Sequence, residues 1–201
     1  MHNNTGFLIA LEGIDGSGTT TQARLLGEYL KLRRKVVCTV EPSKGPIGIL
    51  IRQALVDNKK LSDESLALLF AADRLDHIER EIEPALKEGN IVITDRYLLS
   101  SLAYQSSYLP IDWVLSINSR ARKPDASILL RVSAETAARR RETRGGHKER
   151  FDDIERQGQI AQAYEQTLKL ANVGLTYAIN AENDVETVHN ELKQLLDKIL
   201  P

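Results

Sequence analysis

Short apolar segments alternate with longer amphipathic segments along this chain. Residues 7–11 (Phe-Leu-Ile-Ala-Leu) form a compact apolar run, which predicts a strand buried on both faces. Similar runs recur at residues 36–40, 91–94, 127–132 and 176–179. The segments between them have helical spacing, as at residues 22–33, where Leu25, Leu26 and Leu30 fall on one side. Five strands alternating with helices predict an α/β fold, with a parallel sheet covered on both faces and right-handed crossovers.

The last segment of the chain predicts a helix that packs on the core. Asp184 has the residue type and position of an N-cap. An apolar stripe with helical spacing follows it: Val185, Val188, Leu192, Leu195, Leu196 and Ile199. In a parallel sheet ligands bind beyond the carboxyl ends of the strands, so the loop after each strand is where we look for function.

Composition and charge limit the number of domains, the partners and the location that we expect for this chain. With 201 residues and a formal net charge of −1, the chain predicts one domain over 1–201 and argues against a protein that coats nucleic acid. No apolar run approaches the ~20 residues that cross a bilayer, and residues 1–5 lack the features of a signal peptide, so we expect no membrane partner and a cytoplasmic location. The single cysteine, Cys38, excludes an internal disulfide, and its apolar neighbours predict a buried strand residue.

The first predicted strand runs into Gly13-Ile14-Asp15-Gly16-Ser17-Gly18-Thr19-Thr20, and a helical pattern follows. This spacing is that of the phosphate-binding loop Gly-x4-Gly-Lys-Ser/Thr, with Thr19 in the place of the lysine. The glycines allow backbone amides to turn toward an anion, and the helix adds the positive end of its dipole. Thr20 keeps the hydroxyl that binds Mg²⁺. The loop predicts phosphate binding, while the missing lysine puts the rate of phosphoryl transfer in question.

Two further predicted strands end in charged residues. The strand at 36–40 ends at Glu41-Pro42, and the strand at 91–94 runs into Asp95-Arg96-Tyr97. A carboxylate at such a strand end can orient water on Mg²⁺, and a guanidinium matches the geometry of phosphate. We therefore predict that Asp95 and Thr20 form the metal site.

A predicted helix and the segment after Tyr97 carry the residue types of a base pocket. Phe70 and Arg74 are four residues apart, so both can project from one helical face. They could form a stacking wall and a polar reader of the base edge, opposite Ser100, Ser101, Tyr104 and Gln105. The densest basic run, residues 139–150, is interrupted by glycines, and we expect it to form a mobile lid at about 140–151 that brings arginines over a triphosphate.

Taken together, these stretches resemble the thymidylate kinase family of P-loop nucleoside monophosphate kinases. The matching stretches lie in the same order along nearly the whole chain: Glu12 to Gly18, Glu41-Pro42, Leu69 to Arg74, Asp95 to Tyr97, Ser100 to Gln105 and Tyr177 to Ala181. The resemblance implies a three-layer P-loop NTPase fold and transfer of the γ-phosphoryl group of ATP to dTMP with Mg²⁺. It also implies a homodimer.

The resemblance also implies a role for each matching residue. Phe70 would stack on thymine, Arg74 would bind its edge, and Ser101 and Gln105 would complete the pocket with Ser100 and Glu41. Tyr104 would lie against the deoxyribose, Asp15 would bind the 3′-hydroxyl, and Arg96 would hold the acceptor phosphate. ATP would be bound by the loop, with its residues Gly13, Asp15, Gly16, Ser17, Gly18, Thr19, Thr20 and Thr21, and by Arg140 near the adenine. Arg144 and Arg150 of the lid would join Asp95 and Arg96 as catalytic residues.

Two departures from the family pattern leave alternatives open. Thr19 replaces the lysine, and Val40 stands before Glu41-Pro42 where many members carry arginine; Lys44 is a candidate to replace that charge. A non-catalytic or weakly active nucleotide-binding protein on the same scaffold is therefore one alternative. A kinase for another pyrimidine nucleotide is a second, and an RNA-binding module is a third, which the lack of an aromatic-rich basic sheet face weakens.

Overall fold

Five strands form one parallel sheet in the order β2-β3-β1-β4-β5. The computed structural model describes residues 6–56, 61–144, 153–170 and 173–200. The strands are β1 (Phe7–Glu12), β2 (Val36–Val40), β3 (Ile91–Asp95), β4 (Ala126–Arg131) and β5 (Thr176–Asn180). All five predicted strands are confirmed, each to within a residue at either end. The register pairs Leu11 of β1 with Asp95 and Ile128, so the carboxyl ends of the three central strands meet at one edge of the sheet.

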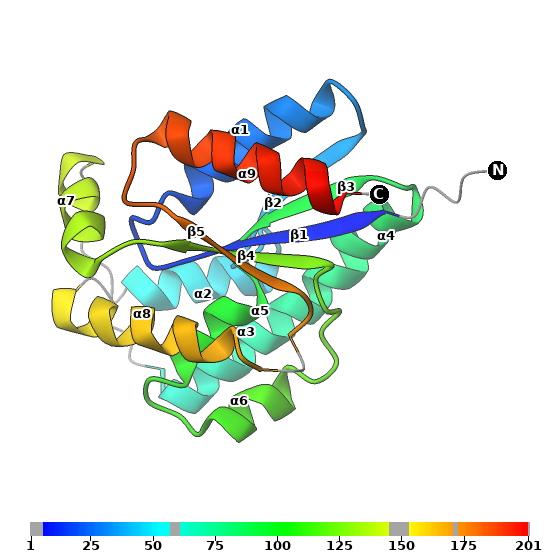
Figure 1. The fold of residues 1–201 in the computed structure, drawn as a ribbon. Helices are drawn as coiled ribbons and strands as arrows, with labels where there is room; N and C mark the ends of the chain where they lie inside the picture. Colours follow the sequence, from blue (N-terminus) through cyan, green and yellow to red (C-terminus); the bar gives the residue numbers. More distant parts are fainter. Residues whose placement is uncertain (1–5, 57–60, 145–152, 171–172, 201) are drawn as a thin grey trace.

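Helices cover both faces of the sheet, as the strand–helix alternation predicts (Figure 1). Helices α1 (Thr19–Lys31) and α9 (Val185–Ile199) lie on one face, and α3 (Asp63–His77), α5 (Leu98–Gln105) and α8 (Ile154–Thr167) lie on the other. The three-layer α/β fold of the P-loop NTPases is thus confirmed. The remaining helices are α2 (Pro46–Val56), a π-helical turn η1 (Ile78–Ile82), α4 (Glu83–Lys87), α6 (Ile111–Ile117) and α7 (Ala134–Arg144).

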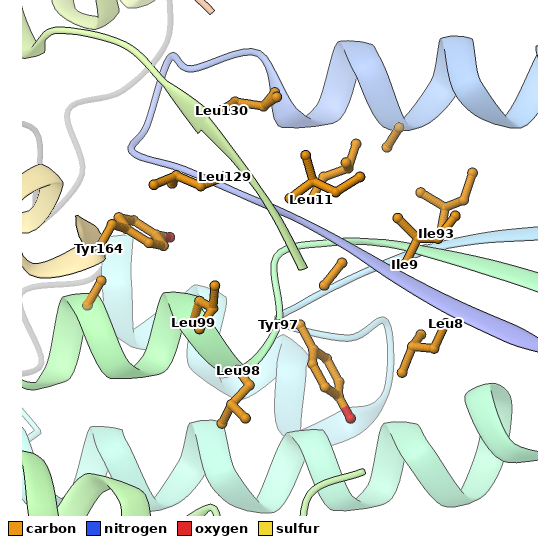
Figure 2. Close-up of a cluster of buried hydrophobic side chains, with 14 of the residues drawn as sticks. Leu8, Ile9, Leu11, Ile93, Tyr97, Leu98, Leu99, Leu129, Leu130 and Tyr164 are labelled. Carbon is orange, nitrogen blue, oxygen red and sulfur yellow. The ribbon is translucent and has the colours of Figure 1, made fainter. Parts of the chain in front are cut away.

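The central strands carry the core of the molecule. Leu8, Ile9 and Leu11 of β1 are fully buried, and they lie among apolar side chains of β3, β4 and α5 in Figure 2. The edge strands β2 and β5 are only partly buried, because each has a neighbour on one side alone. Cys38 lies on β2 and is exposed, so the prediction that it is buried is wrong. Its apolar neighbours in sequence do not reveal that β2 ends the sheet.

Side-chain caps mark where three of the helices begin. Ser62 accepts from the amide of Ser65 at the start of α3, and Asp153 accepts from the amides of Glu155 and Arg156 at the start of α8. Asp184 accepts from the amides of Glu186 and Thr187, which confirms the predicted N-cap of α9.

The apolar stripe of α9 packs on the sheet and α1, with one exception. Val188, Leu192 and Leu196 are buried, whereas Val185 at the first position of the helix is exposed and lines a cavity beside the loop after β1. The prediction that Val185 packs in the core is therefore wrong. Within the part of the chain that the structure describes, no helix has the length and apolar character needed to span a bilayer. The cytoplasmic location stays a prediction.

Candidate active site

The loop after β1 leads into α1 through glycines in a left-handed conformation. Gly16 and Gly18 adopt φ angles of +94° and +100°, a left-handed conformation that glycine adopts without strain. Gly16 has a second constraint, because an added Cβ would lie 2.3 Å from the carbonyl oxygen of Ala137 in α7. Helix α7 therefore packs directly on the loop, and it lies beyond the carboxyl ends of the strands (Figure 1).

A cavity of about 370 Å³ lies over this loop. Apart from Gly13, all the residues predicted to bind ATP line it: Asp15, Gly16, Ser17, Gly18, Thr19, Thr20, Thr21 and Arg140. Gly13 instead offers its carbonyl oxygen to Arg96 and to the hydroxyl of Tyr164. The far wall comes from Ala181, Asn183, Val185 and Val188 at the start of α9. We call this space the nucleotide cavity.

Thr20 and Asp95 lie in hydrogen-bond contact beside the phosphate loop. The Thr20 hydroxyl donates to Oδ2 of Asp95 at 2.5 Å, across a sequence separation of 75 residues. Oδ1 of Asp95 is buried and has no hydrogen-bond partner among the described residues. A buried carboxylate oxygen that lacks a donor, next to a hydroxyl, fits a hard divalent cation with oxygen ligands.

A second cavity, of about 450 Å³, opens between α3, α5 and the end of β2. Every residue predicted to bind the acceptor lines it: Asp15, Glu41, Phe70, Arg74, Arg96, Ser100, Ser101, Tyr104 and Gln105. We call it the acceptor cavity. Asp15, Thr20 and Arg96 line both cavities, so the two spaces meet at these three residues.

Arg74 is almost fully buried in the wall of the acceptor cavity, with 1 % of its surface exposed. Its Nε and Nη2 atoms donate to Oε2 of Glu41 at 3.0 and 2.7 Å. Further donors reach Oδ1 of Asn118, the carbonyl of Tyr97 and the hydroxyl of Ser101. A guanidinium that is fixed by this many partners is held in one orientation in the cavity wall.

Glu41 is held from a second side by His77, which the sequence analysis did not single out. Nδ1 of His77 lies 3.2 Å from Oε1 of Glu41, and Nε2 lies 2.7 Å from the hydroxyl of Thr39. The side chain of His77 is buried, and the π-helical turn η1 begins immediately after it. Because His77 is one turn beyond Arg74 on α3, both contact the same carboxylate.

Arg96 lies at the junction of the two cavities in a strained backbone conformation. Its φ of 69° is unusual for a residue with a side chain. The conformation is held by its amide, which donates to Leu11, and by its carbonyl, which accepts from the Thr94 hydroxyl at 2.7 Å. The guanidinium forms an ion pair with Asp15 and lies 5.2 Å from the ring centre of Tyr104. Strain of this kind is concentrated at functional sites.

A fully buried carboxyl group, Glu12, lies directly before the loop. Its Oε1 accepts from the amide of Leu99 at 3.0 Å and its Oε2 accepts from the Ser100 hydroxyl at 2.5 Å. Burial raises the pKa of Glu12 to about 7, although the Ser100 hydrogen bond and the nearby Arg96 charge act in the opposite direction. Glu12 thus ties the start of α5 to the end of β1.

Comparison with known proteins points to the same family as the motifs in the sequence. The sequence model described as "Thymidylate kinase" matches residues 11–192. The chain belongs to the thymidylate kinase family. It is 42% identical over 199 residues to a "Probable thymidylate kinase" of Pyrococcus horikoshii, which covers 95% of this chain and 96% of that protein.

Two other relatives with the same name are equally close. One from Thermococcus kodakarensis is 43% identical over 204 residues and covers 96% of this chain and 98% of the relative. Another from Methanococcus aeolicus is 45% identical over 199 residues and covers 94% and 96%. The chain is therefore a full-length match to phosphotransferases of this family, which confirms the resemblance drawn from its motifs.

Part of the predicted lid of this family member lies outside the described residues. Arg150 is in that part, and α7 ends at Arg144, whose side chain is also not described. The described part of α7 nevertheless contributes Arg140 and Arg141. Arg140 donates to the carbonyls of Glu182 and Asn183, and Arg141 donates to the carbonyl of Asp15.

The structure also places two polar residues around the site that sequence reasoning left out, Arg52 and Gln157. Arg52 lines the acceptor cavity and donates to the carbonyls of Pro42 and Ser43, both at 2.7 Å. Gln157, buried in α8, bonds both the amide and the carboxylate of Asp15 at 3.2 Å. Lys44, the candidate to replace the arginine missing at Val40, is exposed, and the described residue that brings positive charge to that side of the cavity is Arg52. None of these residues belongs to a local motif that would mark it.

Proposed function

We propose that this chain transfers the γ-phosphoryl group of ATP to dTMP, giving ADP and dTDP. ATP binds in the nucleotide cavity and dTMP in the acceptor cavity. The observation that carries the proposal is that the two cavities meet at Asp15, Thr20 and Arg96. Donor and acceptor phosphates that enter from opposite sides are brought together at one cationic side chain, which favours in-line transfer.

The acceptor cavity has the residues that recognise a pyrimidine nucleotide. Phe70 stacks on the thymine ring, and Arg74 donates to the base edge together with Ser101 and Gln105. Arg74 is held in place by its hydrogen bonds to Glu41, and this supports the role, since a preorganised donor loses little entropy on binding. Tyr104 packs against the deoxyribose, and Asp15 binds its 3′-hydroxyl.

Arg96 holds the acceptor phosphate. This phosphate has a second pKa near ~6 and is already largely a dianion at neutral pH, so the reaction needs no strong general base. It needs relief from the repulsion between two anions. In the structure Arg96 is paired with Asp15 and with the carbonyl of Gly13 at 2.8 Å. A phosphate dianion competes well for a guanidinium that holds these partners, because charge-assisted bonds to phosphate are strong and bidentate.

Thr20 and Asp95 are the residues that would hold Mg²⁺, with ATP oxygens completing its ligands. The buried Oδ1 of Asp95, which has no hydrogen-bond partner among the described residues, supports this assignment. When bound, the ion neutralises charge on the β- and γ-phosphates. Arg144 and Arg150 of the lid are proposed to add positive charge over the same phosphates.

A coupled assay of ADP release with ATP, Mg²⁺ and a panel of nucleoside monophosphates tests the function. We expect dTMP to accelerate ADP release far more than AMP, CMP, GMP or UMP. A preference for another pyrimidine nucleotide would mean that this nucleotide, and not dTMP, is the acceptor. Tight ATP binding without ADP release in the presence of any acceptor would instead support the non-catalytic alternative that Thr19 suggests.

We further propose that the chain forms a homodimer through α2 and α3. These two helices pack against each other and carry large apolar side chains that are between 41 and 60 % exposed: Ile49, Leu50, Val56, Leu68 and Leu75. Large apolar side chains that stay exposed on two neighbouring helices are typical of an interaction site. An apolar surface of one copy can pair with the same surface of a second copy, as in a two-fold symmetric dimer.

A further inference from the structure

Tyr164 of α8 contacts the phosphate loop although it lines neither the nucleotide cavity nor the acceptor cavity. It is buried, with 1 % of its surface exposed, and its ring belongs to the apolar cluster of Figure 2. The hydroxyl group nevertheless donates to the carbonyl oxygen of Gly13 at 3.1 Å. Tyr164 therefore touches the walls of the site and not the space that a substrate fills.

The hydroxyl of Tyr164 is held by a chain of buried polar groups. It lies 2.8 Å from the hydroxyl of Ser100, which donates to Oε2 of Glu12 at 2.5 Å. Burial raises the pKa of Tyr164 well above its ordinary value, so the hydroxyl keeps its proton and remains a donor. The chain joins α8 to α5 and to the end of β1, and these three elements thus fix the position of one oxygen atom.

Oxygen atoms of this chain surround one end of the Arg96 guanidinium. Nη1 donates to the carbonyl of Gly13 at 2.8 Å, and it lies 3.4 Å from the hydroxyl oxygens of Ser100 and Tyr164. Nη2 instead pairs with Asp15, which lines both cavities. The two ends of the guanidinium therefore differ. Nη1 is held by neutral oxygens of the fold, whereas Nη2 is at the side where a phosphate can exchange with a carboxylate.

Tyr164 also packs on the ring that lies against Arg96. Its ring meets that of Tyr104 edge to face, with the ring centres 6.2 Å apart and an angle of 87° between the planes. The Arg96 guanidinium lies 5.2 Å from the centre of the Tyr104 ring. An arginine that is ordered before the ligand arrives loses less side-chain entropy when the ligand binds.

We infer that Tyr164 is a positioning residue for the acceptor phosphate and acts through Arg96. Its hydroxyl keeps Nη1 in place, so that Nη2 is presented to the phosphate. The inference rests on the proposed function, in which Arg96 holds the phosphate of dTMP. Because Tyr164 lines neither cavity, its hydroxyl should matter only for a ligand that carries the phosphate.

The test compares dTMP with thymidine, which lacks the phosphate, by calorimetric titration of the parent and of Tyr164→Phe. We expect the variant to bind dTMP at least about fivefold more weakly, the effect of one lost neutral hydrogen bond. Thymidine and ATP should bind within about twofold of the parent. The variant should fold, because the Gly13 carbonyl keeps its bond from Arg96 and the Ser100 hydroxyl keeps its bond to Glu12. Unchanged dTMP binding would overturn the inference, and so would equal weakening of dTMP and thymidine.

Tyr29→Phe is the matched control. It also removes a tyrosine hydroxyl, but this hydroxyl bonds an exposed carboxylate, Asp197, at 3.1 Å, and Tyr29 lines neither cavity. We expect the control to bind dTMP within about twofold of the parent.

A double-mutant cycle with Arg96→Ala tests the route of the effect. In the Arg96→Ala background, Tyr164→Phe should no longer change dTMP binding, because both substitutions remove one contact with the phosphate. A loss of the same size in both backgrounds would show that Tyr164 acts by another route and would overturn the inference.

The same titrations separate this inference from the proposed function, since they need neither turnover nor a second substrate. If the parent binds dTMP but releases no ADP, the proposed function fails, and the comparison of dTMP with thymidine still decides the role of Tyr164. If the parent prefers another nucleoside monophosphate, that nucleotide and its nucleoside take the place of dTMP and thymidine in the same comparison.

Discussion

Arg96 is the residue whose substitution should weaken dTMP binding more than ATP binding. Its guanidinium pairs with Asp15 at the junction of the cavities, and we expect the acceptor phosphate to compete strongly for the same group. We expect Arg96→Ala to weaken dTMP binding by at least about tenfold, which corresponds to ~1.4 kcal/mol, and to weaken ATP binding much less. Calorimetric titration of each ligand measures both constants. An unchanged dTMP constant would remove Arg96 from the phosphate site.

Glu12 makes the stability of the protein depend on pH. Its pKa is about 7 in the folded chain, against an ordinary value of 4.5, and burial is the main cause. Between these values the folded state keeps a proton that the unfolded state has lost, so stability falls as pH rises. A difference of this size corresponds to roughly 3 kcal/mol over the whole range.

The matched variant for this effect is Glu12→Gln, which keeps the shape and removes the titration. Urea unfolding of both proteins from about pH 5 to about pH 8 gives the comparison. We expect the parent to lose stability relative to the variant as pH rises through this window, and the loss to level off above the folded pKa. Parallel curves for the two proteins would show that Glu12 does not titrate there.

Among the elements, α3 begins with a side-chain cap from Ser62, the residue before its first turn. Ser62 accepts from the amide of Ser65 at 3.1 Å and so satisfies a donor that the helix leaves open. Because α3 carries Phe70 and Arg74, its start positions part of the acceptor cavity. We expect Ser62→Ala to lower the free energy of unfolding, measured by thermal unfolding, by about 1 kcal/mol, with little change in kcat. Ser62→Asp keeps an oxygen acceptor at the cap and should retain the parent stability in the same measurement. Equal losses in both variants would show that the cap does not stabilise α3.

At the scale of the whole molecule, the exposed apolar side chains of α2 and α3 predict self-association. Leu68 of α3 is one of these side chains and is 49 % exposed. A charge at this position in each of two facing copies would be buried without a partner, which is costly. We expect Leu68→Glu to convert a dimer into a monomer in sedimentation experiments. Leu32, which is 83 % exposed at the end of α1, is the control position, and Leu32→Glu should leave the dimer intact. A monomeric parent protein would contradict the homodimer.

The sequence of residue types along the chain was enough to predict the alternation of strands and helices, the loop at residues 13–20 and the N-cap at Asp184. These features depend on neighbours within a few residues, and the period of the apolar positions records them. The residues that line the acceptor cavity could also be named in advance, because they lie in matching stretches of a known family. That the two cavities meet at Asp15, Thr20 and Arg96 follows from the parallel register, which brings the ends of β1 and β3 together.

Tertiary structure alone decided the features that depend on contacts between segments far apart in the sequence. Cys38 is exposed because β2 lies at the edge of the sheet, and no local pattern encodes that position. Arg141 differs little in sequence from Arg139 and Arg140, yet the packing of Ala137 on Gly16 directs it to the loop. Glu12 acquires its raised pKa because the folded chain buries it completely. Local periodicity determines elements, whereas the charge and contacts of a side chain depend on which elements the folded chain brings against it.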